Sequence, residues 1–399
     1  MKVLQYIPKS LCRAPLRMSE NVGTMEAYVS TLTKAMDGYA QVTLTSTLTA
    51  LRRSADEMQP DIIHVHGCEC YSAAKAVLWA VQQGIPVVLS LHGGLMPWQW
   101  QQHSLVTNSI RKYAYLEKAV READALHVNG EMEKKWMEEL KWNPRLEMVY
   151  NSLITNQTTP QRMAARMMKL YQKVIDSNTF RLMSEEEKQT ESTLLRIGIE
   201  HQYTAQLSPL ASHLSSLTPS LDSWRKILLH SGDERILDYI IDATQCLELQ
   251  VPVDIETQAT PRFPQKLQKP KGDLPTDHLL ARHALKTKST LDHLRQDENP
   301  SENEMALCYL LLNIQHASRH AQLSRRHLAQ CFALIRYHDL DEDKVQRMVQ
   351  RLKLESFTDA LLQILHESLE LEEGFMPIEP RDDKTTKHIR NILKNLNIQ

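Results

Sequence analysis

Short apolar runs with strand-forming composition alternate with helical stretches through the first 150 residues, and this alternation constrains the fold more than any other feature. The runs predicted as strands are residues 3–7, 42–45, 61–67, 85–91, 125–129 and 146–150. The stretches predicted as helices between them include residues 24–36, 72–82, 109–122 and 131–140. Nearly continuous apolar strands that alternate with helices predict a parallel sheet covered by helices on both faces.

Glycine use divides the chain into two dissimilar parts. Seven of the 11 glycines lie in the first 130 residues of a 399-residue chain. Because glycine permits positive φ angles and close backbone approach, tight turns and ligand-binding loops are expected in the front part. Ser301 and Glu304 have the spacing of a capping box, as do Ser184 and Glu187, and both pairs predict helix starts in the rest of the chain. The back of the chain is therefore expected to be mainly helical.

Charge and cysteine content exclude several classes of protein. The formal net charge of -2 gives no global basic field that would gather nucleic acid. The six cysteines are scattered and form no CxxC motif, which does not fit a disulfide framework in a chain of this length. No stretch of eighteen apolar residues occurs, and the first residues do not have the pattern of a signal peptide. The default expectation is a cytoplasmic protein without nucleic-acid partners.

Polar residues and glycines directly follow four of the predicted strands. They are His66 with Gly67, His92 with Gly93 and Gly94, Asn129 with Gly130, and Asn151 with Ser152. Ligands of open parallel sheets bind beyond the carboxyl ends of the strands, so these residues are candidates for one binding cleft. The alternative for any one of them is a simple strand-to-helix turn. The occurrence of all four favours a site.

The order of these motifs resembles the N-terminal Rossmann-like domain of retaining glycosyltransferases of the B-type fold, in the subfamily of sucrose synthase and bacterial mannosyltransferases. The resemblance covers residues 1–155, and the motifs that carry it are DIIHVHG (61–67), GIPVVLSLHG (84–93), EKAVREADALH (117–127) and MVYNS (148–152). It implies that this half binds the acceptor, that a second half binds a nucleotide sugar, and that no cofactor or metal is required.

The resemblance also implies which residues act. His92 is the candidate catalytic residue, in contact with sugar hydroxyls. The residues expected to bind substrate are Gly23, His66, Gly67, Gly93, Gly94, Asn129 and Asn151. Gly23 stands alone where the family often has a glycine pair, and Ser152 replaces a glycine.

The second half departs from the family pattern. Residues 226–241 are predicted as a strand, a turn and a helix, but Asp233 and Glu234 in that turn would repel a diphosphate that only Arg235 could hold. Glu248 and Glu256 have the spacing of the family's glutamate pair without its glycine-rich turn. Two hypotheses follow: a glycosyltransferase that moves a sugar from a nucleotide donor to a glycan or lipid-linked acceptor, or a catalytically inactive glycosyltransferase-like binding or scaffold protein. A nucleotidyltransferase-like activity is weakly suggested by the helical tail and lacks a carboxylate motif.

The expected fold class is α/β, with an N-terminal Rossmann-like parallel-sheet domain, a reduced second α/β segment and a C-terminal helical domain. The expected boundaries are residues 1–155 for the first domain, 156–260 for the divergent middle segment, 261–300 for a proline-containing linker, and 301–399 for the helical domain.

Two further patterns have competing interpretations. His64, His66, Cys68 and Cys70 share strand parity and carry zinc-ligating groups, but Gly67 is expected to end the strand and break the alignment, which disfavours a metal site. Residues 161–176 form a basic amphipathic helix. Such a helix can lie on anionic lipid as a peripheral membrane contact, but a solvated face over a domain contact is the more common arrangement.

Overall fold

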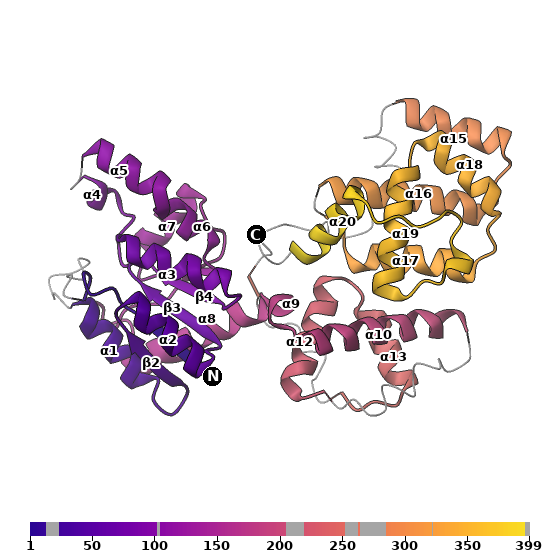
Figure 1. Cartoon of the computed structure of the whole chain (residues 1–399). Coiled ribbons are helices and arrows are strands. Elements are labelled where there is room, and N and C mark those ends of the chain that lie inside the picture. Colours follow the sequence, from indigo (N-terminus) through magenta and orange to yellow (C-terminus); the bar gives the residue numbers. More distant parts are fainter. Residues whose placement is uncertain are drawn as a thin grey trace. The chain divides into compact units, whose positions relative to one another are not determined.

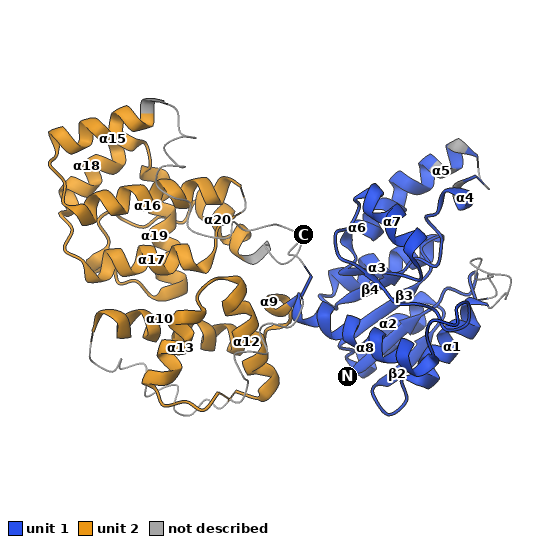
Figure 2. Ribbon diagram, turned by 180° about the vertical axis from the view of Figure 1, so that it is seen from behind, with its two compact units in different colours: residues 1–178, 260–264 blue, residues 179–259, 265–399 orange. Residues whose placement is uncertain are grey.

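The computed structural model describes residues 1–12, 24–101, 104–204, 219–251, 262–263, 285–320 and 322–395. The chain divides into two compact units, shown in different colours in Figure 2. Unit 1 comprises Met1–Asn178 and Thr260–Pro264, and unit 2 comprises Thr179–Ala259 and Gln265–Gln399.

Unit 1 is built on a six-stranded sheet in which every neighbouring pair of strands is parallel. The strands are β1 (Lys2–Tyr6), β2 (Gln41–Thr45), β3 (Ile62–His66), β4 (Val87–Ser90), β5 (Ala125–Val128) and β6 (Leu146–Met148). Their spatial order is β2-β1-β3-β4-β5-β6, so the direction of winding reverses between β1 and β3. The six predicted strands are all present, and the predicted α/β fold class is confirmed.

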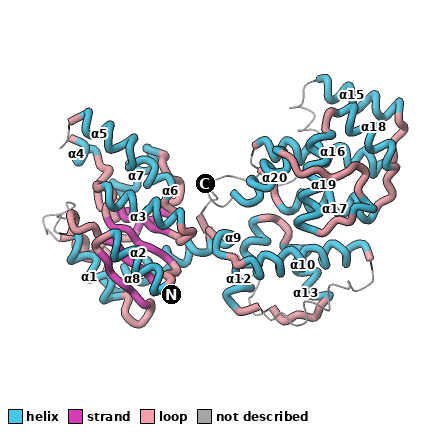
Figure 3. Tube along the Cα trace, viewed as in Figure 1, coloured by secondary structure: helices cyan, strands magenta, loops and turns pink. Residues whose placement is uncertain are grey.

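Helices cover both faces of this sheet, as Figures 1 and 3 show. The helical elements of unit 1 are α1 (Met25–Ala35), α2 (Leu48–Met58), α3 (Tyr71–Gln82), α4 (Pro97–Trp100), α5 (Leu105–Arg111), the π-helical turn η1 (Lys112–Leu116), α6 (Glu117–Glu122), α7 (Glu131–Leu140) and α8 (Pro160–Asp176). Alternate residues of β3 enter different cores, because successive side chains of a strand point to opposite faces. Ile63 packs with α2, α3 and α6, whereas Ile62 packs with α1 and α8.

Helix α8 extends unit 1 beyond the expected boundary at residue 155. Its apolar stripe of Met163, Met167 and Leu170 is buried against the sheet and α1. Its residue Lys173 also forms an ion pair of 2.7 Å with Glu147 of β6. The domain contact expected for this amphipathic helix is therefore present. Because its apolar face is buried within unit 1, the helix cannot offer that face to a lipid surface, and the alternative of a membrane contact through residues 161–176 is wrong.

The described part of unit 2 is helical throughout. Its elements are α9 (Thr179–Leu182), α10 (Glu185–Tyr203), α12 (Leu221–Asp233), α13 (Leu237–Cys246), α15 (Leu285–Asp297), α16 (Glu302–Arg319), α17 (Arg325–Tyr337), α18 (Glu342–Leu352), α19 (Glu355–Leu369), the 3-10 turn η3 (Glu373–Phe375) and α20 (Lys384–Asn395). The capping boxes at Ser184 and Ser301 are both formed. None of the helices in the described ranges is long and apolar enough to cross a membrane.

Two expectations about this part of the chain are corrected. The strand expected from residue 226 is the second half of α12, whose buried face of Trp224, Ile227 and Leu228 follows the helical period rather than the strand period. The described residues of the middle segment thus contain helices and no sheet. Helix α15 also occupies part of the expected linker, while residues 264–284 of that linker lie outside the described residues.

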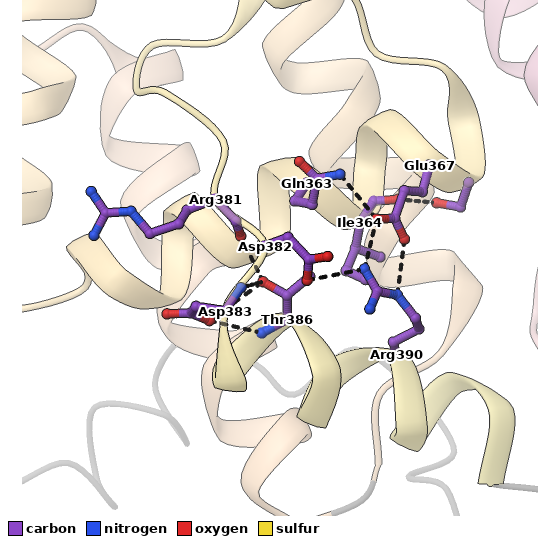
Figure 4. Close-up of polar contacts among 9 residues, drawn as sticks. Gln363, Ile364, Glu367, Arg381, Asp382, Asp383, Thr386 and Arg390 are labelled. Atoms are coloured by element: carbon purple, nitrogen blue, oxygen red, sulfur yellow. Dashed lines mark hydrogen bonds and ion pairs between the residues drawn. The ribbon is translucent and has the colours of Figure 1, made fainter.

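The last described helix is joined to α19 by a charged contact and is capped at its start by Asp383, as Figure 4 shows. The Arg390 guanidinium donates to both carboxylate oxygens of Glu367, at 3.0 and 2.7 Å. This bidentate pair lowers the pKa of Glu367 despite burial, which opposes it, and Gln363 donates a further hydrogen bond of 2.9 Å. At the start of α20, the Asp383 carboxylate accepts from the Thr385 and Thr386 amides.

Candidate functional site

Three of the predicted site residues meet at the carboxyl edge of the sheet. His66 ends β3, His92 lies two residues after β4, and Asn129 directly follows β5. The His66 Nδ1 and His92 Nε2 atoms are 3.2 Å apart, and Asn129 Nδ2 is 3.0 Å from His92 Nδ1. The two imidazole rings stack with centroids 5.5 Å apart. Of the four strand ends in the prediction, three therefore contribute side chains to one hydrogen-bonded group.

The same group is more enclosed than an open cleft would be. Tyr28 of α1 places its ring edge against both imidazoles, with centroid distances of 5.9 Å to His66 and 5.0 Å to His92. As a result His66 has no exposed surface, Asn129 keeps 4% and His92 keeps 9%. The expectation that His66 faces an open cleft is wrong, because β3 is central in the sheet and α1 covers its carboxyl end. His92 has the most exposed surface in the group.

The glycines of this edge have structural reasons to be glycine. Gly67 and Gly93 have φ angles of +80° and +81°, in the region that strains other residues. A Cβ on Gly94 would lie 2.8 Å from the Cys68 sulfur and 3.1 Å from the Leu91 carbonyl oxygen, so the loop has no room for a side chain. Their predicted role in substrate binding stays a prediction. Gly23 lies outside the described residues.

A second group of buried side chains, beside the first, forms a linear chain of hydrogen bonds in which every donor is satisfied. His127 Nε2 is 3.0 Å from the Val149 carbonyl oxygen, which can only accept, so this nitrogen carries the ring hydrogen. The other nitrogen of the neutral ring therefore accepts from the Ser90 hydroxyl at 2.6 Å. Ser90 in turn accepts from His64 Nε2 at 2.6 Å, and His64 Nδ1 accepts from the Tyr171 hydroxyl at 2.7 Å. Every hydrogen in this chain has an acceptor.

In the group of His66, His92 and Asn129, by contrast, the atom at each end has no hydrogen-bond partner. The Asn129 amide donates to His92 Nδ1, so His92 carries its hydrogen on Nε2 and donates it to His66 Nδ1. His66 then holds a hydrogen on Nε2, and this buried atom has no partner. Asn129 Oδ1 at the other end, the Tyr28 hydroxyl beside the rings, and Asn151 Nδ2 after β6 are also buried without a hydrogen-bond partner. Since buried polar atoms are nearly always paired, the three atoms of the group formed by Tyr28, His66, His92 and Asn129 call for a partner such as ordered water or a polar ligand, and Asn151 Nδ2 calls for a partner at its own position.

Burial holds all four imidazoles in the neutral form. It lowers the pKa of His92 to about 3, with a further contribution from His127, and it lowers the pKa of His127 to about 4. Burial also lowers the pKa values of His64 and His66 well below the ordinary value, and neighbouring histidines add to the shift. Neutral imidazoles can donate one hydrogen bond and accept another, which suits hydroxyl groups better than anions.

A buried carboxylate fixes the two loops that carry His92 and Asn129. Glu133, in the first turn of α7, accepts from the Gly93 amide at 2.6 Å and from the Asn129 amide at 2.9 Å. Burial raises the pKa of Glu133 to about 7, although these two amides act in the opposite direction. His92 itself has a φ of 50°, in the left-handed region that a residue other than glycine rarely adopts. Glu133 thus helps to hold a strained backbone at the site.

The structure separates the residues that could have formed a zinc site. His64 and His66 point to the α1 and α8 face of the sheet, whereas Cys68 belongs to the core on the other face, because the positive φ of Gly67 breaks the strand alternation. Within the described ranges, no three histidine, cysteine or acidic side chains are grouped so as to hold a metal ion.

The turn at residues 231–235, which stands where the resemblance places a diphosphate site, is part of a helical charge network in unit 2. Ser231 and His230 both donate to the buried Glu191 carboxylate, at 2.8 Å, and Arg325 donates to it at 2.9 Å. Burial alone would raise the pKa of Glu191, but His230 and Arg325 outweigh it and lower that pKa. Glu234 accepts from the Arg325 amide at 2.7 Å. The segment thus stabilises packing among α10, α12 and α17.

A cavity of about 570 Å³ lies next to this network and is lined in part by His230 and Glu234. Its wall carries four cations, Arg181, Lys188, Arg325 and Arg390, and three carboxylates, Glu185, Glu234 and Glu367. Three of the cations form ion pairs: Lys188 with Glu185, Arg325 with the buried Glu191, and Arg390 with Glu367. Because these charges are compensated, the cavity does not present the excess positive charge that a diphosphate needs.

Sequence reasoning missed several residues of the site: Tyr28, Ser90, His127, Glu133 and Tyr171. Two signals could have found some of them. Glu133 is four residues after Asn129 at the start of a predicted helix, where a carboxylate can accept from free amides. His127 ends the third quoted motif and lies inside the predicted strand 125–129, where a buried imidazole requires partners on neighbouring strands. Tyr28 and Tyr171 come from helices distant in sequence, and no local pattern marks them.

Unit 1 is a Rossmann-like α/β domain with a polar group at the carboxyl edge of its sheet. Residues 23–152 match the family model described as a Glycosyl transferase 4-like domain. The match covers about a third of the chain and supports a B-type-fold glycosyltransferase N-terminal domain, so this part of the chain is glycosyltransferase-like. No significant match was found among curated proteins or among solved structures.

Proposed function

We propose that this chain is a glycosyltransferase-like binding protein that recognises the sugar of a glycan or lipid-linked acceptor at the group of His66, His92 and Asn129. The observation that carries the proposal is the set of four buried polar atoms without partners at the carboxyl edge of the sheet. The family match of residues 23–152 supports a sugar as the ligand.

The chemistry of the four atoms suits a polyhydroxylated ligand. His66 Nε2 and Asn151 Nδ2 offer hydrogens, Asn129 Oδ1 offers lone pairs, and the Tyr28 hydroxyl can do either. A sugar hydroxyl donates and accepts at once, so it can satisfy both kinds of atom. His92 links the inner atoms to the protein surface, because it bonds to both His66 and Asn129 and keeps the most exposed surface of the three.

Binding without sugar transfer is favoured by the character of unit 2. Donor binding would require a second lobe whose cations hold the departing diphosphate. The described residues of unit 2 form no sheet, and Lys188, Arg325 and Arg390 are each paired with a carboxylate.

Transfer of a sugar from a nucleotide-sugar donor is the second candidate, and the description of the matching family favours it. In that case His92 would contact the reacting sugar as a neutral hydrogen-bonding group. Burial lowers its pKa to about 3, which leaves it uncharged at neutral pH. Nucleotide sugars are therefore included in the test.

Calorimetry of the full chain with a panel of monosaccharides, glycans and nucleotide sugars tests the proposal. We expect at least one sugar to bind, and His92→Ala to weaken it about tenfold, because the substitution removes the imidazole that joins Asn129 to His66. His293→Ala is the matched control, because His293 is an exposed histidine in α15 of the other unit.

The results separate the two candidates. Release of nucleoside diphosphate from a nucleotide sugar, together with appearance of the sugar on an added glycan acceptor, would establish transfer in place of binding alone if both signals are lost in His92→Ala and retained in His293→Ala. If no sugar binds, or if His92→Ala binds as tightly as the unmodified chain, the unpaired atoms serve ordered water and the proposal fails.

A further inference from the structure

The cavity of unit 2 is large for the interior of a helical domain. It measures about 570 Å³ and is surrounded by α9, α10, α12, α17, α19 and α20. Figure 4 shows Ile364, Glu367 and Arg390, which belong to its wall. Protein interiors are packed so closely that few spaces exceed the size of a water molecule, whereas cavities that bind small molecules measure about 300–1,000 Å³. The helices therefore surround a space of the size that a small molecule requires.

One part of the cavity wall is apolar and rigidly packed. Four aliphatic side chains line the cavity and belong to the core of unit 2, and each is at most 3% exposed: Leu195, Leu328, Ile364 and Leu369. Because they come from α10, α17 and α19, three helices fix this surface. An alkyl or aryl group in contact with it would be removed from water, which is favourable.

A histidine provides a polar group on the same wall. His230 Nδ1 lies 2.8 Å from the fully buried Glu191 carboxylate, whereas His230 Nε2 lies 3.9 Å from Oε1 of Glu234, a wall residue. The second distance is too long for a hydrogen bond. Phe180 stacks on the imidazole, with ring centroids 4.8 Å apart, and holds its orientation. The ring thus presents Nε2 on the side of the cavity, where a ligand can reach it.

The charges around the cavity favour an uncharged ligand. The four cations of the wall are matched by its three carboxylates and by the buried Glu191, which pairs with Arg325 at 2.9 Å. With a neutral His230 these charges balance. A ligand that carries a carboxylate or an ammonium group would lose its hydration in the cavity without meeting an excess of opposite charge.

We propose that this cavity binds a neutral amphipathic molecule that has an alkyl or aryl body and a hydroxyl group. The body would contact the aliphatic part of the wall, and the hydroxyl would pair with His230 Nε2. A hydroxyl suits this atom because it donates to a neutral imidazole and accepts from a protonated one. The proposal does not rest on the sugar site of unit 1.

Calorimetric titration of the full chain with n-octanol, octanoate and octyltrimethylammonium tests the proposal, because the three probes share one alkyl chain and differ in charge. We expect octanol to bind about tenfold more tightly than either charged probe. Ser368→Phe should weaken octanol binding about tenfold or more, because Ser368 lies on the wall and the larger ring would fill the space. Ser356→Phe is the matched control, since Ser356 is an exposed serine of the same helix, α19.

Nuclear magnetic resonance provides a separate test of the hydroxyl contact. Octanol should shift the imidazole signals of His230 and leave those of His293, an exposed histidine of α15, unchanged.

Four results would overturn the proposal. They are absence of octanol binding, binding of a charged probe as tight as that of octanol, equal effects of the two phenylalanine variants, and unchanged His230 signals. Circular dichroism checks that Ser368→Phe is folded. The comparison of the three probes uses the unmodified chain, so it decides the proposal even if this variant does not fold.

Discussion

At the scale of residues, the buried polar groups of unit 1 divide into a satisfied set and an unsatisfied set. Ser90 is the centre of the satisfied set, because its hydroxyl accepts from His64 and donates to His127, both at 2.6 Å. His66 and Asn129 belong to the unsatisfied set, in which each has a buried atom without a partner. The hydrogen bonds of the first set explain how the sheet interior accommodates the imidazoles of His64 and His127. The unpaired atoms of the second set mark where a ligand could form hydrogen bonds.

Ser90→Ala should lower the free energy of unfolding of unit 1 by about 2–4 kcal/mol. The substitution leaves a buried N–H on His64 and a buried lone pair on His127 without partners, and each such loss costs about 1–3 kcal/mol. Urea unfolding followed by fluorescence measures the change. Ser109→Ala, on the exposed face of α5, is the control and should change stability by less than about 0.5 kcal/mol. A loss below about 1 kcal/mol in Ser90→Ala would contradict the hydrogen-bond chain.

At the scale of elements, the two units are built by different kinds of packing. The strands of unit 1 are fully buried between helices, so their sequences are continuously apolar. In unit 2 the helices pack against one another, and α10 meets α13 in a close contact at Gly198. A Cβ on Gly198 would lie 2.0 Å from the Tyr239 carbonyl oxygen. This crossing therefore depends on the absence of a side chain.

Gly198→Ala should destabilise unit 2 by about 3 kcal/mol or more, even though alanine favours helices. The added methyl group meets backbone atoms of α13, which cannot rotate away, and overpacking of this kind costs about 1–3 kcal/mol or more. Thermal unfolding followed by circular dichroism measures the effect. Gly374→Ala is the control, because a Cβ there meets nothing within 4 Å and the residue has no positive φ. Equal melting temperatures for the two variants would show that α10 and α13 are not so closely packed.

At the scale of the whole molecule, unit 1 and unit 2 differ in how their stability depends on pH. Unit 1 buries four neutral imidazoles whose pKa values burial lowers below the unfolded value. Their contribution to stability is complete above the unfolded pKa of about 6.5 and is lost as the pH falls toward the folded pKa values. Unit 2 instead buries the ionised Glu191, whose pKa is lowered, mainly by His230 and Arg325 against the opposing effect of burial. That contribution is present above the unfolded pKa of a glutamate and persists at pH 5.

Unit 1 should therefore unfold before unit 2 on acidification. Between pH 7 and pH 5, His92 and His127, with pKa values of about 3 and about 4, each lose about 2 kcal/mol of stabilisation. His64 and His66 act in the same direction. Glu133 acts in the opposite direction, because its raised pKa of about 7 means that its burial is unfavourable at neutral pH and that about 2 kcal/mol is recovered at pH 5. The net change is a loss of at least about 2 kcal/mol.

Two spectroscopic signals can resolve the units. Five of the six tryptophans lie in the first 178 residues, so tryptophan fluorescence reports mainly on unit 1. Circular dichroism at 222 nm reports on the helices of both units. The urea midpoint of fluorescence should fall between pH 7 and pH 5 while a second circular dichroism transition remains. A fluorescence midpoint that is unchanged or higher at pH 5 would contradict the neutral burial of the imidazoles.

The sequence by itself determined the sheet, because apolar runs of strand length and their intervening helices are local patterns. It also determined which strand ends carry His66, His92 and Asn129, since these residues directly follow the runs. Helix starts at Ser184 and Ser301 were equally predictable, because a capping box needs only residues three positions apart.

Only the tertiary structure decided how those residues are used. The enclosure of His66 depends on Tyr28, and the position of the His92 loop depends on Glu133, and both contacts form between elements that are separate in sequence. Residues 226–230 could be assigned to a strand or to a helix, because a short apolar run fits both periods until its neighbours are known. The packing of α12 against α10 selected the helix, and with it the helical character of unit 2.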